Sequence, residues 1–218
     1  MHKNILLIIT VLFVCTISVG CSSNEKRLST DVPKIEDKEY GEQDFEKNID
    51  ICINYPQIVN EQKISNQSEI NKLLHDYFKV EAKDGLYYYS NYEIKMLTSE
   101  IISIVKKAES YIKGSPYPST EFGAININIR TASALKFDDI LSDEMLLSAV
   151  DENEVSSFNG VNGLLAVHSY EALIDMFLNQ IERVYYITDS GIGIIIYLNH
   201  TSGDYVLLEI PLALKLGK

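Results

Sequence analysis

The chain has 218 residues, of which 46% are hydrophobic and 23% are charged, and its formal net charge is −12. This balance is typical of a folded globular protein and excludes an intrinsically disordered chain. The negative charge argues against nucleic acid as a partner, because the phosphate backbone would be repelled.

The first twenty-one residues predict export from the cytoplasm. Met1–Lys3 is short and basic, Ile5–Val19 is almost wholly apolar, and small residues lead into Cys21. This order is typical of a secretory signal peptide. A cysteine after the small residues resembles a bacterial lipobox, so we expect residues 1–20 to be removed and Cys21 to carry a lipid on the outer face of the cell membrane. The alternative is an uncleaved anchor, although about fifteen apolar residues fall short of the roughly 20 that a membrane-spanning helix needs.

A polar segment and a strand–helix pattern come next. Residues 21–45 are rich in charged and hydroxyl side chains, which predicts a flexible tether. Ile49–Tyr55 alternates with a period of two, which predicts a strand with one buried face, and Pro56 is expected to end it. Ser68 is expected to cap a helix whose apolar residues recur at helical spacing through Phe78.

The middle of the chain mixes clear and ambiguous patterns. The tyrosine-rich stretch Leu86–Met96 is expected to be a strand. The pattern of Ile101–Ile112 fits a helix and a strand equally well, so periodicity does not decide. Ile125–Ile129 alternates cleanly and predicts a strand. A short helix is expected over Ser142–Val150, and the residues Ser156–Gly163, rich in Ser, Asn and Gly, are expected to form an exposed loop.

The C-terminal part reads as one helix followed by three strands. Ser169 is expected to cap a helix whose apolar face runs through Ile181. Val184–Ile187, Ile192–Leu198 and Tyr205–Ile210 are separated by turn residues suited to hairpins. An antiparallel meander packed on a helix is the expected result.

Several short strings, taken in order, resemble the extracytoplasmic region of lysozyme-sensing anti-sigma factors, a domain also related to one that precedes the catalytic domain of some peptidoglycan deacetylases. The strings cover residues 48–212 and are Ile53–Pro56, Ile102–Ile104, Gly114–Pro118, Thr131–Leu141, Val184–Ile192, Gly203–Val206 and Ile210–Pro211. The chain departs from the family where Tyr117 replaces a histidine and where Thr131–Ser133 lacks a glycine.

The resemblance implies an α+β body made of two small domains. The N-terminal α+β domain would span residues 46–113, and the C-terminal α+β domain, with its antiparallel sheet meander packed on helices, would span residues 114–218. It also implies that residues 101–108 form a strand. The implied roles are binding roles, either sensing a muramidase or associating with the cell wall.

No pattern in the sequence predicts catalysis, a metal site or a cofactor. The histidines have no partner at metal-ligand spacing. Asp138–Asp139 could be half of a carboxylate pair for acid–base chemistry, but adjacent side chains diverge, and a structural turn with an aspartate cap is favoured. Cys52 lies in an apolar strand and is expected to be an inert buried thiol. We therefore expect a binding protein and not an enzyme.

The expected binding surface is an acidic stretch of the C-terminal domain, which would attract a basic partner such as a lysozyme-type muramidase. Its candidate ligand-binding residues, with one aromatic residue added, are Asp138, Asp139, Asp143, Glu144, Asp151, Glu152, Glu154 and Tyr117.

Two alternative functions remain open at this point. One is a peptidoglycan-binding module, in which the tyrosines from Tyr87 to Tyr92 and Tyr117 stack on sugar rings. The other is an enzyme that acts on wall or peptide substrates, as a cell-wall hydrolase or a deacetylase accessory, and it has the least support because no nucleophile–base–orienter set is visible.

Overall fold

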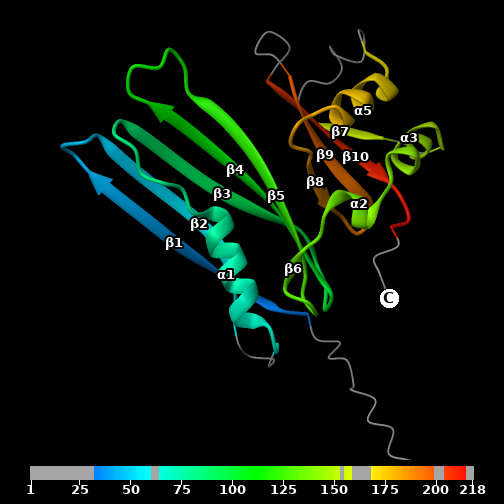
Figure 1. Cartoon of the computed structure of the whole chain (residues 1–218), viewed down its shortest axis with the longest axis horizontal. Helices are drawn as coiled ribbons and strands as arrows, with labels where there is room; N and C mark the ends of the chain where they lie inside the picture. Colours follow the sequence, from blue (N-terminus) through cyan, green and yellow to red (C-terminus); the bar gives the residue numbers. More distant parts are fainter. Residues whose placement is uncertain (1–31, 60–63, 153–154, 159–167, 199–203, 215–218) are drawn as a thin grey trace, which may run out of the picture.

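A computed structural model describes residues 32–59, 64–152, 155–158, 168–198 and 204–214. It is an α+β fold with two sheets (Figure 1), as the sequence predicted. The larger sheet has the strand order β1-β2-β3-β4-β5-β6 and the smaller one β7-β10-β9-β8. The strands are β1 (Lys34–Asp44), β2 (Ile49–Val59), β3 (Leu86–Leu97), β4 (Ile101–Ile112), β5 (Ser119–Asn128), β6 (Ser133–Ala134), β7 (Ser156–Phe158), β8 (Val184–Ile187), β9 (Gly191–Tyr197) and β10 (Tyr205–Pro211). The helices are α1 (Gln67–Phe78), α2 (Phe137–Ile140), α3 (Asp143–Glu152) and α5 (Tyr170–Leu178).

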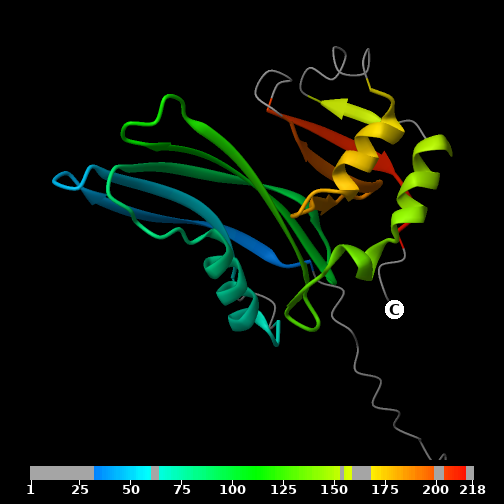
Figure 2. The same cartoon turned by 45° about the horizontal axis from the view of Figure 1, so that its top comes forward.

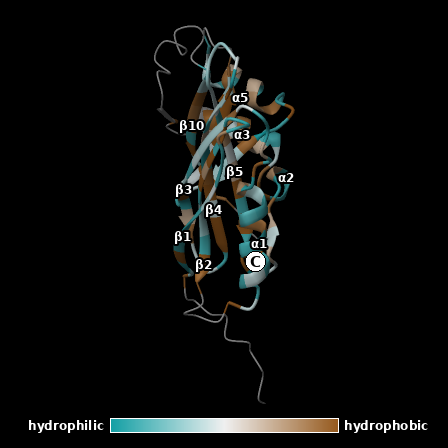
Figure 3. Ribbon diagram, turned by 90° about the vertical axis from the view of Figure 1, so that its left-hand side faces the viewer, coloured by the Kyte–Doolittle hydropathy of each residue, from teal (hydrophilic) through white to brown (hydrophobic). Residues whose placement is uncertain are grey.

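The larger sheet is mixed, because β2 and β3 run parallel while its other neighbours are antiparallel. Its strands alternate buried and exposed residues, and Figure 3 shows the corresponding interleaving of hydrophobic and hydrophilic positions. Helix α1 covers one face and buries Ile70, Leu74 and Phe78 against it (Figure 2). This arrangement confirms the helical period that the sequence shows through Phe78.

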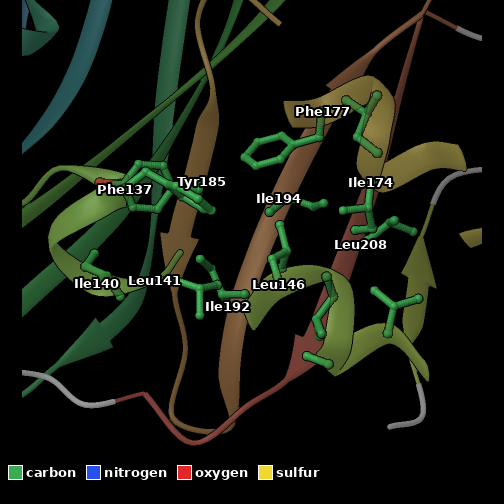
Figure 4. Packing of buried hydrophobic residues seen from close by; sticks show 14 of the residues in the cluster. Phe137, Ile140, Leu141, Leu146, Ile174, Phe177, Tyr185, Ile192, Ile194 and Leu208 are labelled. Atoms are coloured by element: carbon green, nitrogen blue, oxygen red, sulfur yellow. The ribbon is translucent and has the colours of Figure 1, made fainter. Parts of the chain in front are cut away.

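The smaller sheet is covered on both faces. Helices α3 and α5 pack on one face, where a large apolar cluster forms (Figure 4). On the other face, Tyr186 of β8 and Ile195 of β9 pack with Val105 of β4. Strands buried on both faces lose the alternation of half-buried strands, and accordingly every residue of β8 is buried. The antiparallel order β8-β9-β10 confirms the predicted meander.

Two buried side chains of the larger sheet join it to the smaller one. Asn126 of β5 donates from Nδ2 to the carbonyl of Tyr185 at 3.0 Å, and Ser103 of β4 accepts from the backbone N–H of Ile187 at 2.8 Å. Ser103 Oγ also donates to Asn126 Oδ1 at 2.7 Å. Strand β8 is the edge of its sheet, so these side chains satisfy backbone groups that would otherwise be buried without partners.

Several sequence expectations need correction. The predicted tether reaches residue 45, but Lys34–Asp44 is strand β1, which pairs with β2 along its whole length. Pro56 does not end β2, because β3 pairs with β2 only over Asp50–Ile53 and one edge of the strand is open at the proline. The proposed loop at Ser156–Gly163 begins instead with strand β7, and its residues 159–163 lie outside the described part.

Other expectations are confirmed or shifted slightly. The ambiguous stretch Ile101–Ile112 is strand β4, as the family resemblance implied. Ser169 caps α5 by accepting a hydrogen bond from the backbone of Ala172 at 3.3 Å. Helix α1 begins one residue before Ser68, and its cap position is Asn66. The division at residue 114 does not follow the sheets, because β5 and β6 come after it and belong to the larger sheet.

Candidate functional site

An open cleft of about 910 Å³ lies where the two sheets meet. Its walls are Tyr77 of α1, the edge of β5 from Ala124 to Asn126, the segment that leads from β6 into α2 and α3, and the residues that precede β8. The cleft therefore brings together segments that are more than a hundred residues apart in the sequence.

Asp143 and Arg183 form a clamp at one wall of the cleft. Arg183 donates from Nη1 to Asp143 Oδ1 at 2.8 Å and from Nη2 to Oδ2 at 3.2 Å, the two-pronged geometry that planar guanidinium and carboxylate groups favour. The same guanidinium donates to the carbonyl of Leu178 and lies 5.3 Å from the ring centre of Phe137. The clamp therefore holds the first turn of α3 against the chain that enters β8.

Two further carboxylates lie outside that two-pronged pair, at the mouth of the cleft. The side chain of Asp138 is 88% exposed and lies 4.0 Å from Arg183 Nη1, at the limit of an ion pair. Glu144, one residue beyond Asp143, is exposed as well. Ile181 stands beside them as a fully exposed apolar side chain. An exposed apolar residue next to exposed carboxylates is suited to a partner that presents both apolar and basic groups.

The floor of the cleft includes a buried tyrosine. Tyr185 donates from its hydroxyl to the carbonyl of Leu135 at 2.6 Å, and its ring lies edge-to-face against Phe137 at 5.2 Å (Figure 4). The pKa of Tyr185 is raised to about 12, mainly by burial; a hydrogen bond from Asn126 lowers it in part, and the negative charges of Asp139 and Asp138 contribute to the rise. The phenol therefore stays protonated and keeps its hydrogen bond at any physiological pH.

The structure brings together only part of the predicted acidic set. Asp138, Asp143 and Glu144 line the cleft, whereas Asp139 turns to the backbone and accepts from the N–H of Lys136 at 3.0 Å, which closes the first turn of α2. That contact gives Asp139 a structural role at the third position of the helix, whereas the cap position is Lys136 and Asp138 stays exposed. Ser142 similarly accepts from the N–H of Met145 at 3.3 Å at the start of α3.

The remaining predicted residues are elsewhere or cannot be placed. Tyr117 is 70% exposed in the connection between β4 and β5, at the end of that hairpin opposite the cleft. Asp151 and Glu152 close helix α3, but their side chains, together with Glu154 and Cys21, lie outside the described residues.

Sequence reasoning missed the residues that give the cleft its shape. Arg183 is a single arginine ahead of a strand, and its pairing with Asp143 spans 40 residues of sequence. Ile181 was assigned to the apolar face of a helix, but α5 ends at Leu178 and leaves Ile181 fully exposed. Neither role has a local sequence signal, because both depend on where distant segments meet.

A second, smaller hollow of about 310 Å³ lies on the face of the larger sheet opposite α1. The exposed rings of Tyr87, Tyr89 and Tyr111 line it, together with Asp50 and Glu109. Tyr88 points to the other face and is buried, as the period of two requires. The tyrosine cluster expected from the sequence is therefore divided between the core and this hollow.

Within the described ranges, no group of three or more His, Cys, Asp or Glu side chains could hold a metal ion. In the same ranges no helix is long and apolar enough to cross a membrane. Cys52 is half-buried, and burial raises the pKa of its thiol, with a further contribution from the charges of Glu39 and Asp50. A raised pKa leaves little of the nucleophilic thiolate near neutral pH.

Comparisons with known proteins give relatives in fold only. No protein-family profile matches the chain, and a search of curated proteins finds no match. A crystal structure of a DUF3298 family member from Bacteroides fragilis is similar, with 15% identity, a TM-score of 0.55, and coverage of 85% of this chain and 92% of its own. A DUF3298 family protein from Pseudomonas aeruginosa has 12% identity, a TM-score of 0.51, and coverage of 84% and 92%. The chain therefore has the fold of an uncharacterised domain family.

Proposed function

We propose that this chain is a lipid-anchored, non-catalytic binding or sensor protein of the extracytoplasmic face of the cell membrane, and that its cleft receives a basic protein of the lysozyme type. The observation that carries the proposal is the position of the exposed carboxylates of Asp138 and Glu144 beside the exposed Ile181. The net charge of −12 adds a long-range attraction for a basic partner, which mainly raises the rate of association. The resemblance to lysozyme-sensing anti-sigma factors points to the same class of partner.

The test is a binding measurement with a basic lysozyme-type muramidase at low and at physiological salt. Asp138→Asn combined with Glu144→Gln is expected to weaken binding by roughly tenfold at low salt, with a smaller effect at high salt because exposed charges are screened. Glu39→Gln combined with Glu46→Gln, two exposed changes in β1 and in the turn that follows it, is the matched control for the two lost charges and should have little effect. Absence of binding by the unaltered chain at both salt concentrations would remove this partner.

The anchor has its own test. Cells that express the full chain are labelled with a radioactive fatty acid, and the label is expected on the wild-type protein but not on Cys21→Ala. An unlabelled wild-type protein in the cytosolic fraction would contradict both the lipid and the location.

A peptidoglycan-binding module is the second candidate, favoured by the hollow between Tyr87, Tyr89 and Tyr111. Aromatic rings beside carboxylates suit sugar rings, which offer both apolar faces and hydroxyl groups. In co-sedimentation with purified peptidoglycan, Tyr87→Ala with Tyr89→Ala should reduce the bound fraction, whereas Asp138→Asn should not. Equal sedimentation of the wild type and the tyrosine variant would count against this site.

A further inference from the structure

We infer that the cleft recognises an extended, basic polypeptide segment that adds to the free edge of β5 at Ala124. This inference deepens the proposed function and rests on it, because it states how the partner would be held. Its basis is a stretch of strand edge that borders the cleft and that has no ladder partner besides β4, although the side chain of Ala124 packs against the smaller sheet.

The directions of the backbone groups follow from the register of β5. Phe122 donates its N–H to Tyr197 Oη at 2.8 Å, and its carbonyl accepts from the same hydroxyl at 2.7 Å. On the other side of Ala124, the carbonyl of Asn126 accepts from the N–H of Leu135 at 2.7 Å. Phe122 and Asn126, each two positions from Ala124, therefore show the direction in which alternate backbone groups of β5 point. Both contacts point away from β4.

Ala124 lies midway between these two residues and faces Val105 in the ladder with β4. In an antiparallel pair, alternate residues direct both backbone groups to the same side. The N–H and C=O of Ala124 must therefore point away from β4 as well. Strand β6 pairs with β5 only from Ile127 onward, so it does not reach this position.

The open edge is short, and its two ends limit the length of strand that can be added to it. Tyr197 closes it at Phe122 and Leu135 closes it at Asn126, which leaves room for about three residues, or roughly 10 Å, of added strand. A strand that adds to a sheet edge gains its affinity from backbone hydrogen bonds and its selectivity from side-chain contacts. The geometry therefore favours a short extended stretch of a partner over a broad flat surface.

The side chains around this edge select the charge of the occupant. Asp138 and Glu144 line the same cleft as Ala124, and Arg183 is already held by Asp143. The exposed carboxylates of Asp138 and Glu144 thus favour a lysine or arginine in the added segment. Ile181 offers an apolar contact for a neighbouring side chain.

The first experiment uses a peptide on the unaltered full chain. The probe is acetyl-Thr-Lys-Val-Lys-Thr-amide, and the readout is hydrogen exchange of the Ala124 amide, measured by NMR. We expect the probe to slow this exchange roughly tenfold, because the amide becomes hydrogen-bonded. The same peptide with every backbone amide methylated keeps its charge and loses its donors, and it should give no protection.

The second experiment removes the donor from the protein. Ala124→Pro removes an N–H that points away from the ladder and puts a ring carbon in its place, at a position where an edge strand tolerates proline. It is expected to weaken binding of the basic muramidase about five- to tenfold, the loss of roughly one hydrogen bond together with its local fit. Ala124→Gly keeps the N–H and is the control.

The outcomes separate the mode of binding from the function. Muramidase binding that is insensitive to Ala124→Pro, together with unchanged Ala124 exchange, would overturn the added strand and leave the binding function standing. An Ala124 amide that is already protected in the free chain and loses protection when residues 22–31 are deleted would show that the chain fills its own edge, which also overturns the inference. Failure of both muramidase and peptide to bind would remove the function itself.

Discussion

At the scale of single residues, position 193 has room only for glycine. It faces Tyr186 across the pair of β8 and β9, and a Cβ atom on it would lie 2.0 Å from the ring carbon Cζ of Tyr186. The phenol ring thus lies directly over the glycine and is fully buried there. Its hydroxyl donates to Glu209 at 2.8 Å, which limits how far the ring can move away.

We therefore predict that Gly193→Ala lowers the free energy of unfolding by at least about 2 kcal/mol, because overpacking in a dense core forces side chains out of their rotamers. Urea denaturation followed by circular dichroism measures the change. Gly41→Ala is the matched control, since the nearest atom to its added Cβ is a carbonyl oxygen at the ordinary contact distance of 3.5 Å. Equal stability of the two variants would contradict this account.

At the scale of elements, the two sheets are joined by side chains that take the place of a neighbouring strand and form hydrogen bonds with the backbone at a strand edge. Strand β8 has a ladder partner only in β9, and its other edge meets Asn126 and Ser103. The edge of β5 is treated in the same way by the hydroxyl of Tyr197. Polar side chains from the opposite sheet thus bind the edge of β8 and the edge of β5 at Phe122, which fixes the relative position of the two sheets.

Asn126→Ala is predicted to cost about 2–4 kcal/mol of stability, because it leaves the hydroxyl proton of Ser103 without its acceptor and the carbonyl of Tyr185 without its donor in a buried place. Urea denaturation of the variant gives the value. Asn91→Ala, at an exposed position of β3, is the control and should change stability by less than about 0.5 kcal/mol. A small effect at Asn126 would mean that water replaces the lost amide.

Helices and strands with a regular apolar pattern could be predicted from the sequence, whereas a strand without such a pattern could not. Strand β2, strand β5 and helix α5 were expected because their apolar residues repeat at the period of a half-buried strand or helix. Strand β1 could not be expected, since its residues are mostly charged and exposed and it is held by the backbone ladder with β2.

The candidate site was also predictable only in part, because a sequence shows local patterns but not the contacts between distant segments. The acidic character of residues 138–144 is visible in the sequence, and three of these carboxylates do line the cleft. The free edge at Ala124 depends on where β6 ends and where Tyr197 lies, and those are long-range facts with no local signal.

At the scale of the whole molecule, buried tyrosines govern stability in alkali. Burial raises the pKa of Tyr185 to about 12, and burial followed by the hydrogen bond to Glu209 raises the pKa of Tyr186 as well. Near pH 10 an unfolded chain loses phenol protons that the folded chain keeps, so folding then binds protons and stability falls as pH rises.

We expect stability to be insensitive to these phenols below about pH 10 and to fall between pH 10 and about 12. Urea midpoints measured at pH 9 and pH 11 give the decline. Tyr185→Phe should make the decline shallower even though it lowers stability at pH 9 by about 1 kcal/mol through the lost hydrogen bond to Leu135. Tyr87→Phe, on the exposed face of β3, is the control, and an identical decline in both variants would argue against the role of Tyr185.

Strand β1 also sets how far the protein can act from a lipid at Cys21. The strand starts at Lys34, so about 13 residues separate the attachment point from the sheet. Even fully extended, a linker of that length spans no more than about 45 Å. This is roughly half of the span that a linker reaching to residue 45 would have. With a lipid at Cys21, the folded part would stay within that distance of the bilayer, and a partner would have to approach the membrane surface to bind it.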